Sequence, residues 1–113
     1  MKRGEVWLVN LDPTIGAEIK KSRPCVIVNQ NALASLPLKI IVPLTTWNDQ
    51  FEHAAWHVRI MPTRQNGLKS ESSADTFQVR SISEKRLVKK FGELSPEVLE
   101  GINQAISISL ALD

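Results

Sequence analysis

The segment RPCVIVNQ, residues 23–30, sets the character of the fold. Its apolar run of cysteine, valine and isoleucine is rich in β-branched side chains and predicts a buried strand. Pro24 pushes the residue before it toward extended backbone angles, so the strand should open at Arg23. The guanidinium of that residue then leaves the core at the end of the strand, which makes Arg23 a positioned cation.

Further strands are predicted on both sides of this segment. Residues 4–11 alternate as a first strand, and the turn-rich residues 12–22 form the loop that leads to Arg23. Downstream, strands are predicted at residues 38–47, 55–60, 71–82 and 89–94, after a short helical turn or loop at residues 31–35. Asp75 is a point at which the fifth strand can break. Pro43 cannot donate to a ladder, so it predicts an edge, a bulge or the exit of its strand.

The final segment changes from strand to helix periodicity. Ser95 is suited to the N-cap, Pro96 to the first helical position and Glu97 to the first turn. Apolar residues then recur at helical spacing, namely Val98, Ile102, Ala105 and Ile106, with Ile108 and Leu112 widening the stripe. Five or six short strands followed by one helix predict a mainly β fold, a small and strongly bent antiparallel sheet or barrel that packs the helix on its apolar face.

Composition limits the class of protein. The chain of 113 residues, 42% apolar and 23% charged, fits one domain over residues 1–113. It contains no apolar run long enough for a membrane span or a secretory leader, which predicts a cytoplasmic protein without a membrane partner. The single cysteine, Cys25, lies in the apolar run and predicts a core residue, and no cluster has zinc-ligand spacing.

Charge is unevenly distributed along the chain. The formal net charge is only +2, yet residues 57–90 hold eight basic and three acidic residues, and residues 91–113 hold four acids and no base. This pattern predicts either an ordinary solvated surface or a basic face that attracts a polyanion or an acidic protein segment.

An acid and a base frame the loop before the second strand. Glu18 precedes Arg23 by five residues, across a loop that contains Gly16. The two side chains could converge on one substrate, where the carboxylate transfers a proton and the guanidinium neutralises phosphate charge. A simple salt bridge between loop and strand is the alternative.

The end of the third strand combines hydroxyl and aromatic groups. Thr45 or Thr46 could donate to a phosphate oxygen, and Trp47 could stack on an unpaired base. The alternative is that threonine is a good strand former and that the tryptophan covers the edge of the core. His53 and His57 have the spacing of a helical metal pair, but their surroundings predict a loop that enters a strand, so they are interpreted as surface histidines or, at most, as RNA contacts.

Three blocks of the sequence resemble one known family. GEVWLVNLDPTIGAEIKKSRPCVIV (residues 4–28), IIVPLTT (residues 40–46) and FQVRSISEKRL (residues 77–87) are similar to the MazF/PemK toxin endoribonucleases of bacterial type II toxin–antitoxin pairs. The resemblance implies a small SH3-like barrel with a terminal helix (MazF/PemK/CcdB-like) and a homodimer. It also implies a cognate antitoxin partner and sequence-specific cleavage of single-stranded RNA, including mRNA, without metal or cofactor.

The same resemblance assigns roles by position. The catalytic arginine of the family falls on Arg23, its threonine on Thr45 and its loop acid on Glu18. Cleavage would proceed by attack of a 2′-hydroxyl on the adjacent phosphorus. Glu18 would then act as base or acid, Arg23 would stabilise charge because its pKa is too high for proton transfer, and Thr45 would hold a phosphate oxygen.

Further RNA contacts are expected on residues around this set, namely Lys20, Lys21, Thr46, Trp47, Gln78 and Arg80. The chain departs from the family in the fifth strand, where many members carry Asp directly before Gln and this sequence has Phe77. Phe77 is therefore expected either to stack a base or to fill the core. Gln78 and Arg80 are expected to shape the site or the dimer interface.

A second function class fits the same fold. A toxin without nuclease activity, similar to the CcdB-like gyrase poisons, would bind a protein target through its dimer and helix surface. A family member that has lost cleavage is a related alternative. Replacing Arg23 by alanine would leave the toxicity of either protein intact.

Overall fold

Seven strands and one α-helix form the fold in the computed structural model, which describes residues 1–112. The elements are β1 (Glu5–Asn10), β2 (Ser22–Ile27), β3 (Leu38–Thr46), β4 (His57–Ile60), β5 (Ser72–Asp75), β6 (Arg80–Ser83), β7 (Leu87–Glu93) and α1 (Pro96–Leu110). Short 3₁₀ turns occur at η1 (Asn31–Leu33), η2 (Asp49–His53), η3 (Thr76–Gln78) and η4 (Glu84–Arg86). The predicted mainly β fold with a C-terminal helix is confirmed.

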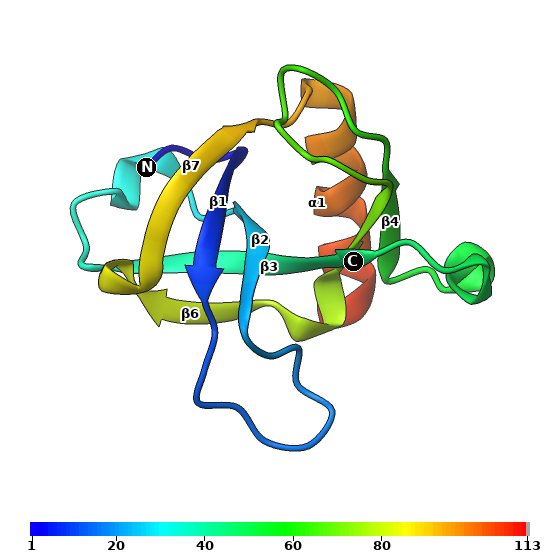
Figure 1. Cartoon of the computed structure of the whole chain (residues 1–113), viewed down its shortest axis with the longest axis horizontal. Helices are drawn as coiled ribbons and strands as arrows, with labels where there is room; N and C mark the ends of the chain where they lie inside the picture. Colours follow the sequence, from blue (N-terminus) through cyan, green and yellow to red (C-terminus); the bar gives the residue numbers. More distant parts are fainter. Residues whose placement is uncertain (113) are drawn as a thin grey trace.

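The strands form one antiparallel sheet in the order β4-β5-β3-β2-β1-β7, with β6 as a further neighbour of β3 (Figure 1). The sheet has seven strands rather than five or six because the predicted strand at residues 71–82 is two strands. Asp75 ends the first of them, since its carboxylate accepts the backbone N–H of Phe77 at 3.1 Å and starts the turn η3. Within residues 1–112 the ladder does not close into a complete barrel.

Pro43 lies inside β3, so its predicted place at the exit of a strand is wrong, but within residues 1–112 one side of β3 is unpaired at this position, in agreement with the predicted edge or bulge. It pairs with Cys25 on β2, in the long strand β3. On the other side of β3, the pairing with β6 ends at Ile41 and the pairing with β5 begins at Leu44. A residue without an N–H is tolerated here because β3 changes its neighbour at this position.

Helix α1 begins and ends with regular caps. The Ser95 hydroxyl accepts the N–H of Val98 at 3.3 Å, and Pro96 occupies the first turn, as predicted. Ala111 closes the helix in the left-handed conformation. No helix in residues 1–112 combines the length and the apolar character needed to cross a bilayer.

Apolar side chains fill both faces of the sheet. The core between the sheet and α1 consists of Val6, Val26, Val28, Val42, Leu44, Ile60, Leu68, Ala74, Leu94 and Ile102. The core on the face turned away from α1 consists of Val9, Leu11, Cys25, Ile27, Ile41 and Ile82. Cys25 is fully buried, as predicted, and burial raises the pKa of its thiol to about 12.

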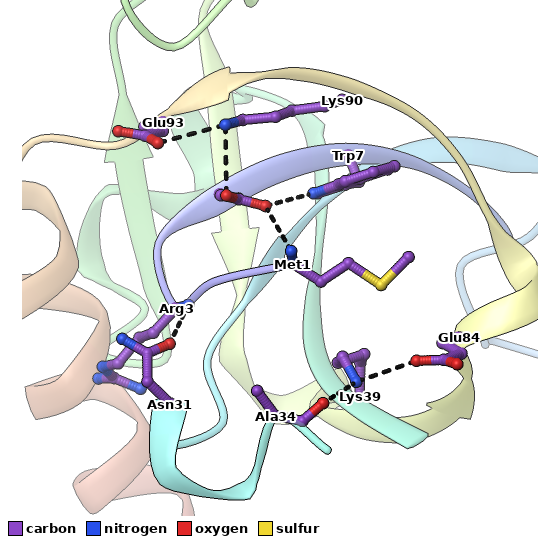
Figure 2. Close-up of polar contacts among 10 residues, drawn as sticks. Met1, Arg3, Trp7, Asn31, Ala34, Lys39, Glu84, Lys90 and Glu93 are labelled. Carbon is purple, nitrogen blue, oxygen red and sulfur yellow. Dashed lines mark hydrogen bonds and ion pairs between the residues drawn. The ribbon is translucent and has the colours of Figure 1, made fainter. Parts of the chain in front are cut away.

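Lys39 and Glu5 are buried charged side chains that hold neighbouring segments of the chain together through polar contacts (Figure 2). Lys39 is 1% exposed, and its ammonium donates to the carbonyls of Ala34, Leu36 and Leu38 and to the carboxylate of Glu84, at 2.8–3.2 Å. This lysine therefore organises the connection before β3 from the inside.

Glu5 is the second buried charge, 5% exposed. Its carboxylate accepts the indole N–H of Trp7 at 2.9 Å and pairs with Lys90 at 3.2 Å and with the amino group of Met1 at 3.5 Å. Burial alone would raise the pKa of Glu5, but these donors outweigh burial and hold it at about 2. The carboxylate thus fastens the N-terminus and β1 to β7.

Candidate functional site

The loop between β1 and β2 forms one wall of a cleft. Figure 1 shows this loop projecting from the sheet at the bottom of the view, away from α1. The turn η3 and the start of β6 form the opposite wall. The cleft has a volume of about 370 Å³ and is lined by Leu11, Ala17, Glu18, Ile19, Pro43, Phe77, Gln78, Val79 and Arg80.

Gln78 holds the two walls of the cleft at a fixed separation. Its side-chain oxygen accepts the backbone N–H of Ile19 at 2.7 Å, and its amide nitrogen lies 3.3 Å from the carbonyl of Ala17 and 3.1 Å from the carboxylate of Asp75. Arg80 reaches the carbonyl of Leu11 at 3.4 Å, at the base of the loop. Both side chains therefore shape the cleft.

Glu18 lies on the wall of the cleft and is exposed to solvent. Its carboxylate accepts the backbone N–H of Ile15 at 2.6 Å, a bond that closes a turn inside the loop. No salt bridge joins Glu18 to Arg23 in the part of the chain that the structure describes. A carboxylate oriented by one backbone donor keeps acceptor capacity for a ligand in the cleft.

Arg23 and Thr45 lie on the same face of adjacent strands. The ladder between β2 and β3 pairs Cys25 with Pro43. Arg23 lies two residues before Cys25 and Thr45 two residues after Pro43, so both side chains lie on the same face as that pair. Arg23 is also the partner of Val9, which belongs to the core turned away from α1. Because paired residues share a face, Arg23 and Thr45 are on the side of the cleft.

This row of side chains continues onto the next two strands. Thr45 pairs with Ser73 on β5, and Ser73 pairs with Arg59 on β4. We call Arg23, Thr45, Ser73 and Arg59 the polar row. Arg23 is half-buried, and its Nε donates to the carbonyl of Lys20 at 3.3 Å. Four of its five N–H donors thus remain for an anionic ligand.

The other predicted RNA contacts are not all at this face. Thr46 pairs with Ser72 and alternates to the opposite side of the sheet from Thr45, so these two hydroxyls are not brought together. Lys20 and Lys21 are exposed on the loop that forms the cleft wall. Lys21 adopts a positive φ of 70°, and its N–H donates to Asp12 at 3.1 Å, which closes the base of the loop.

Trp47 is half-buried at the end of the polar row. Its indole N–H donates to Asp49 at 3.1 Å, the Arg59 guanidinium lies 4.8 Å from its ring centroid, and Phe51 meets it edge to face. The indole thus anchors the turn η2, which agrees with the reading that it covers an edge of the core. Stacking of Trp47 on an unpaired base stays a prediction.

Phe77 is 71% exposed on the rim of the cleft. The expectation that it fills the core is therefore wrong, and the base-stacking alternative remains as a prediction. Its outward position follows from η3, where the buried carboxylate of Asp75 caps the turn and Thr76 points inward instead. An exposed phenylalanine on the rim of the cleft is a ready stacking surface.

Sequence reasoning did not single out Ser73 of the polar row or Phe51 beside it, and it assigned His57 no catalytic role. Ser73 is fully buried, His57 is half-buried and bonds to it at 2.7 Å, and the ring of Phe51 stacks on His57. His57 is half-buried and so less exposed than a typical surface histidine, and the alternative that it contacts RNA stays a prediction. Only the register of β4 on β5 brings these residues together, and no spacing in the sequence signals it.

No group of three or more His, Cys, Asp or Glu side chains in residues 1–112 is arranged to hold a metal ion.

Comparison with known proteins covers nearly the whole chain. Residues 2–110 match the family model of the PemK-like, MazF-like toxins of type II toxin–antitoxin systems. The endoribonuclease EndoA of Bacillus subtilis is 30% identical over 112 residues, which cover 99% of this chain and 96% of EndoA. Endoribonuclease MazF9 of Mycobacterium tuberculosis is 29% identical over 115 residues, which cover 99% of this chain and 98% of MazF9.

Solved structures show the same fold at lower identity. MazF from Deinococcus radiodurans superposes with a TM-score of 0.81 at 18% identity, covering 98% of this chain and 96% of that one. An endoribonuclease in complex with its cognate antitoxin, from a mycobacterial species, superposes with a TM-score of 0.78 at 22% identity, covering 100% and 97% of the two chains.

Proposed function

Because this chain belongs to the family of PemK-like, MazF-like toxins of type II toxin–antitoxin systems, we propose that it is a sequence-specific endoribonuclease that cleaves single-stranded RNA. The observation that supports the proposal is that Arg23 and Thr45 lie on one face of adjacent strands, the face that also bears the cleft walled by Glu18. Relatives over nearly the whole chain length are named endoribonucleases, which supports the same activity here.

The polar row and the cleft supply the parts of the reaction. Arg23 and Thr45 bind the scissile phosphate, and the guanidinium stabilises the charge that develops on its oxygens. The adjacent 2′-hydroxyl attacks phosphorus, and the bond to the 5′-oxygen breaks, so the nucleophile comes from the substrate. Glu18 transfers a proton at the cleft wall, and Phe77 offers a stacking surface at its rim.

RNA binding by this face is mainly electrostatic. Lys20 and Lys21 are exposed in the loop that leads to Arg23, and Trp47 lies against Arg59 at the far end of the polar row. Each lysine that neutralises a phosphate releases counterions, so the affinity for single-stranded RNA should fall steeply with salt concentration. Binding that is unchanged between 50 and 300 mM salt would contradict this part of the proposal.

The activity test uses purified protein, a long unstructured RNA and EDTA, with cut ends mapped by primer extension. The wild type is expected to cut at discrete sites, and Arg23→Ala to lose roughly 10²–10³-fold in rate, as for removal of one transition-state donor. Arg64→Ala, at an exposed arginine on the connection between β4 and β5, is the matched control and should cut like the wild type.

Other results would change the proposal. No cuts by the wild type on several diverse RNAs would favour a toxin that binds a protein target. Cuts that persist in Arg23→Ala would keep the ribonuclease and move its centre elsewhere. Loss of all cutting on addition of EDTA, with recovery on adding a divalent ion, would overturn the metal-independent mechanism.

A homodimer and a cognate antitoxin complete the proposal, with the cytoplasm as the place of action. The last turns of α1 leave apolar side chains exposed, with Ile108 62% and Leu110 52% exposed. Such a surface is expected to be covered by a second copy of the chain. Sedimentation at micromolar concentration should give a dimer, and a monomer would contradict this assignment.

A further inference from the structure

The imidazole of His57 is held from two sides at the end of the polar row. Its Nδ1 lies 2.7 Å from the hydroxyl oxygen of Ser73. Phe51 stacks on the ring with 3.8 Å between centroids and 5° between planes. Ser73 is completely buried, and a buried hydroxyl needs a hydrogen-bond partner, so the ring orientation is fixed by both contacts.

The register places this imidazole close to the proposed phosphate site. Ser73 is the direct cross-strand partner of Thr45. Side chains paired in this way on one face of a sheet lie about 4.5–5.5 Å apart at Cβ. His57 on β4 pairs with Asp75 on β5, and its Nδ1 reaches Ser73 on the same strand, so β5 lies between His57 and Thr45 on β3, and Arg23 is one strand further, on β2.

The proposed reaction needs a group that removes a proton from the 2′-hydroxyl, and the neighbouring side chains are poorly suited to this step. Arg23 stays protonated at any physiological pH. The carboxylate of Asp75 already accepts the N–H of Phe77 and the side-chain amide of Gln78. Glu18 is available at the cleft wall but is bound to Ile15 within a solvent-exposed loop.

We propose that His57 is the catalytic base of the ribonuclease reaction, an inference that rests on the proposed function. Nδ1–H donates to Ser73, which leaves the lone pair on Nε2 free to take the proton of the 2′-hydroxyl. The bond between O2′ and phosphorus forms, and the bond between phosphorus and O5′ breaks. O5′ takes a proton from the carboxyl group of Glu18, and both residues then exchange protons with solvent.

The surroundings of the ring keep it in the neutral form that a base requires. Burial lowers the pKa of His57 below its ordinary 6.5, and the nearby carboxylate of Asp75 partly opposes this effect. The other titratable groups on the elements around the ring are Asp49, Glu52 and His53 of η2 and Arg59 on the same strand. Near pH 7 the imidazole is therefore mostly unprotonated.

The test measures single-turnover cleavage of a short RNA that contains one mapped cut site, from pH 5 to pH 9. His57→Asn keeps an amide donor near Ser73 but removes the proton acceptor. It is expected to slow cleavage about 100-fold and to flatten the rise of the rate with pH, while RNA affinity and the melting temperature stay unchanged. His53→Asn, at an exposed histidine of η2, is the matched control and should behave like the wild type.

Two further measurements make the outcome decisive. The pKa of His57 titrated by NMR in the wild type should coincide with the pKa of the rising limb of the rate profile. An RNA with sulfur in place of O5′ has a better leaving group, so it should rescue a variant that lacks the acid but not His57→Asn.

Three results would overturn the assignment. These are cleavage by His57→Asn within threefold of the wild type, a kinetic pKa that differs from that of the imidazole, and rescue of His57→Asn by the sulfur substrate. A wild type that cuts no RNA is a separate outcome, because it would remove the proposed ribonuclease function itself.

Discussion

Lys39 and Arg23 are both cations on neighbouring strands of the same sheet, yet the protein treats them in opposite ways. The ammonium of Lys39 is 1% exposed and has four acceptors within 3.2 Å. Arg23 is half-buried and makes one bond, 3.3 Å long, to a backbone carbonyl. The hydrogen-bond donors of Lys39 are engaged within the fold, whereas Arg23 retains donors for a ligand. Hydrogen-bond saturation thus separates structural charges from functional ones.

The largest effect on stability is expected at Lys39. Lys39→Met keeps the length of the side chain and leaves the carbonyls of Ala34, Leu36 and Leu38 without their donor. Removing one member of a buried, hydrogen-bonded charged group should lower the free energy of unfolding by about 3 kcal/mol. Urea unfolding measures the loss, and cleavage per folded molecule should not change. The exposed Lys85→Met on η4 is the control, and an equal loss there would break the comparison.

Glu5 should show the next largest effect, with a dependence on pH. Its folded pKa of about 2 lies below the ordinary 4.5, a difference worth roughly 3 kcal/mol. Because the folded pKa is depressed, this stabilisation is present above pH 4.5 and is lost as the pH falls toward 2. Glu5→Gln should therefore be destabilised at pH 7 and approach the wild type near pH 2.

The control for that prediction shares the same cation. Lys90 also pairs with Glu93, whose side chain is 51% exposed. Glu93→Gln should change the free energy of unfolding by well under 1 kcal/mol at any pH, because exposed pairs contribute little. A destabilisation of Glu5→Gln that is the same at pH 7 and pH 2 would mean that packing, and not charge, makes Glu5 important.

Gln78 is intermediate between Lys39 and Arg23. It is a neutral side chain whose hydrogen-bonding capacity is nearly all in use, and it also belongs to the proposed site. Gln78→Ala leaves the N–H of Ile19 without its acceptor and releases the cleft wall, at a cost of about 1 kcal/mol. Amide hydrogen exchange at Ile19 should become several-fold faster, and KM for RNA should rise. Gln104→Ala, on the exposed side of α1, should change neither quantity.

The elements could be predicted where a local pattern determines them. The caps at Ser95 and Pro96 defined the start of α1, and the apolar run around Cys25 defined β2. The break at Asp75 was visible as a local signal, but its consequence was not, because two strands with different partners on β3 replace one. The position of Pro43 depends on where β3 changes neighbours, a tertiary property with no local signature.

The residues of the proposed site also fall into two groups, those that a local sequence pattern indicates and those that only the tertiary structure brings together. Glu18 and Arg23 could be singled out as an acid and a base that frame one loop, whereas the choice of Thr45 over Thr46 came from the resemblance to the MazF/PemK family. His57 and Ser73 are 16 residues apart and meet only through the pairing of β4 with β5. No periodicity in the sequence predicts the stacking of Phe51 or the burial of Ser73. This part of the face could therefore be identified only in the structure.

The smallest expected effect is the most informative for the comparison. Arg23→Ala should change the free energy of unfolding by less than about 0.5 kcal/mol, because it removes one long hydrogen bond from a half-exposed side chain. The same variant is expected to lose most of its cleavage activity. A cation that hardly affects folding but is essential for activity is free to serve the substrate. If Arg23→Ala instead lost as much stability as Lys39→Met, the arginine would be a second structural charge, and the difference between the two residues would disappear.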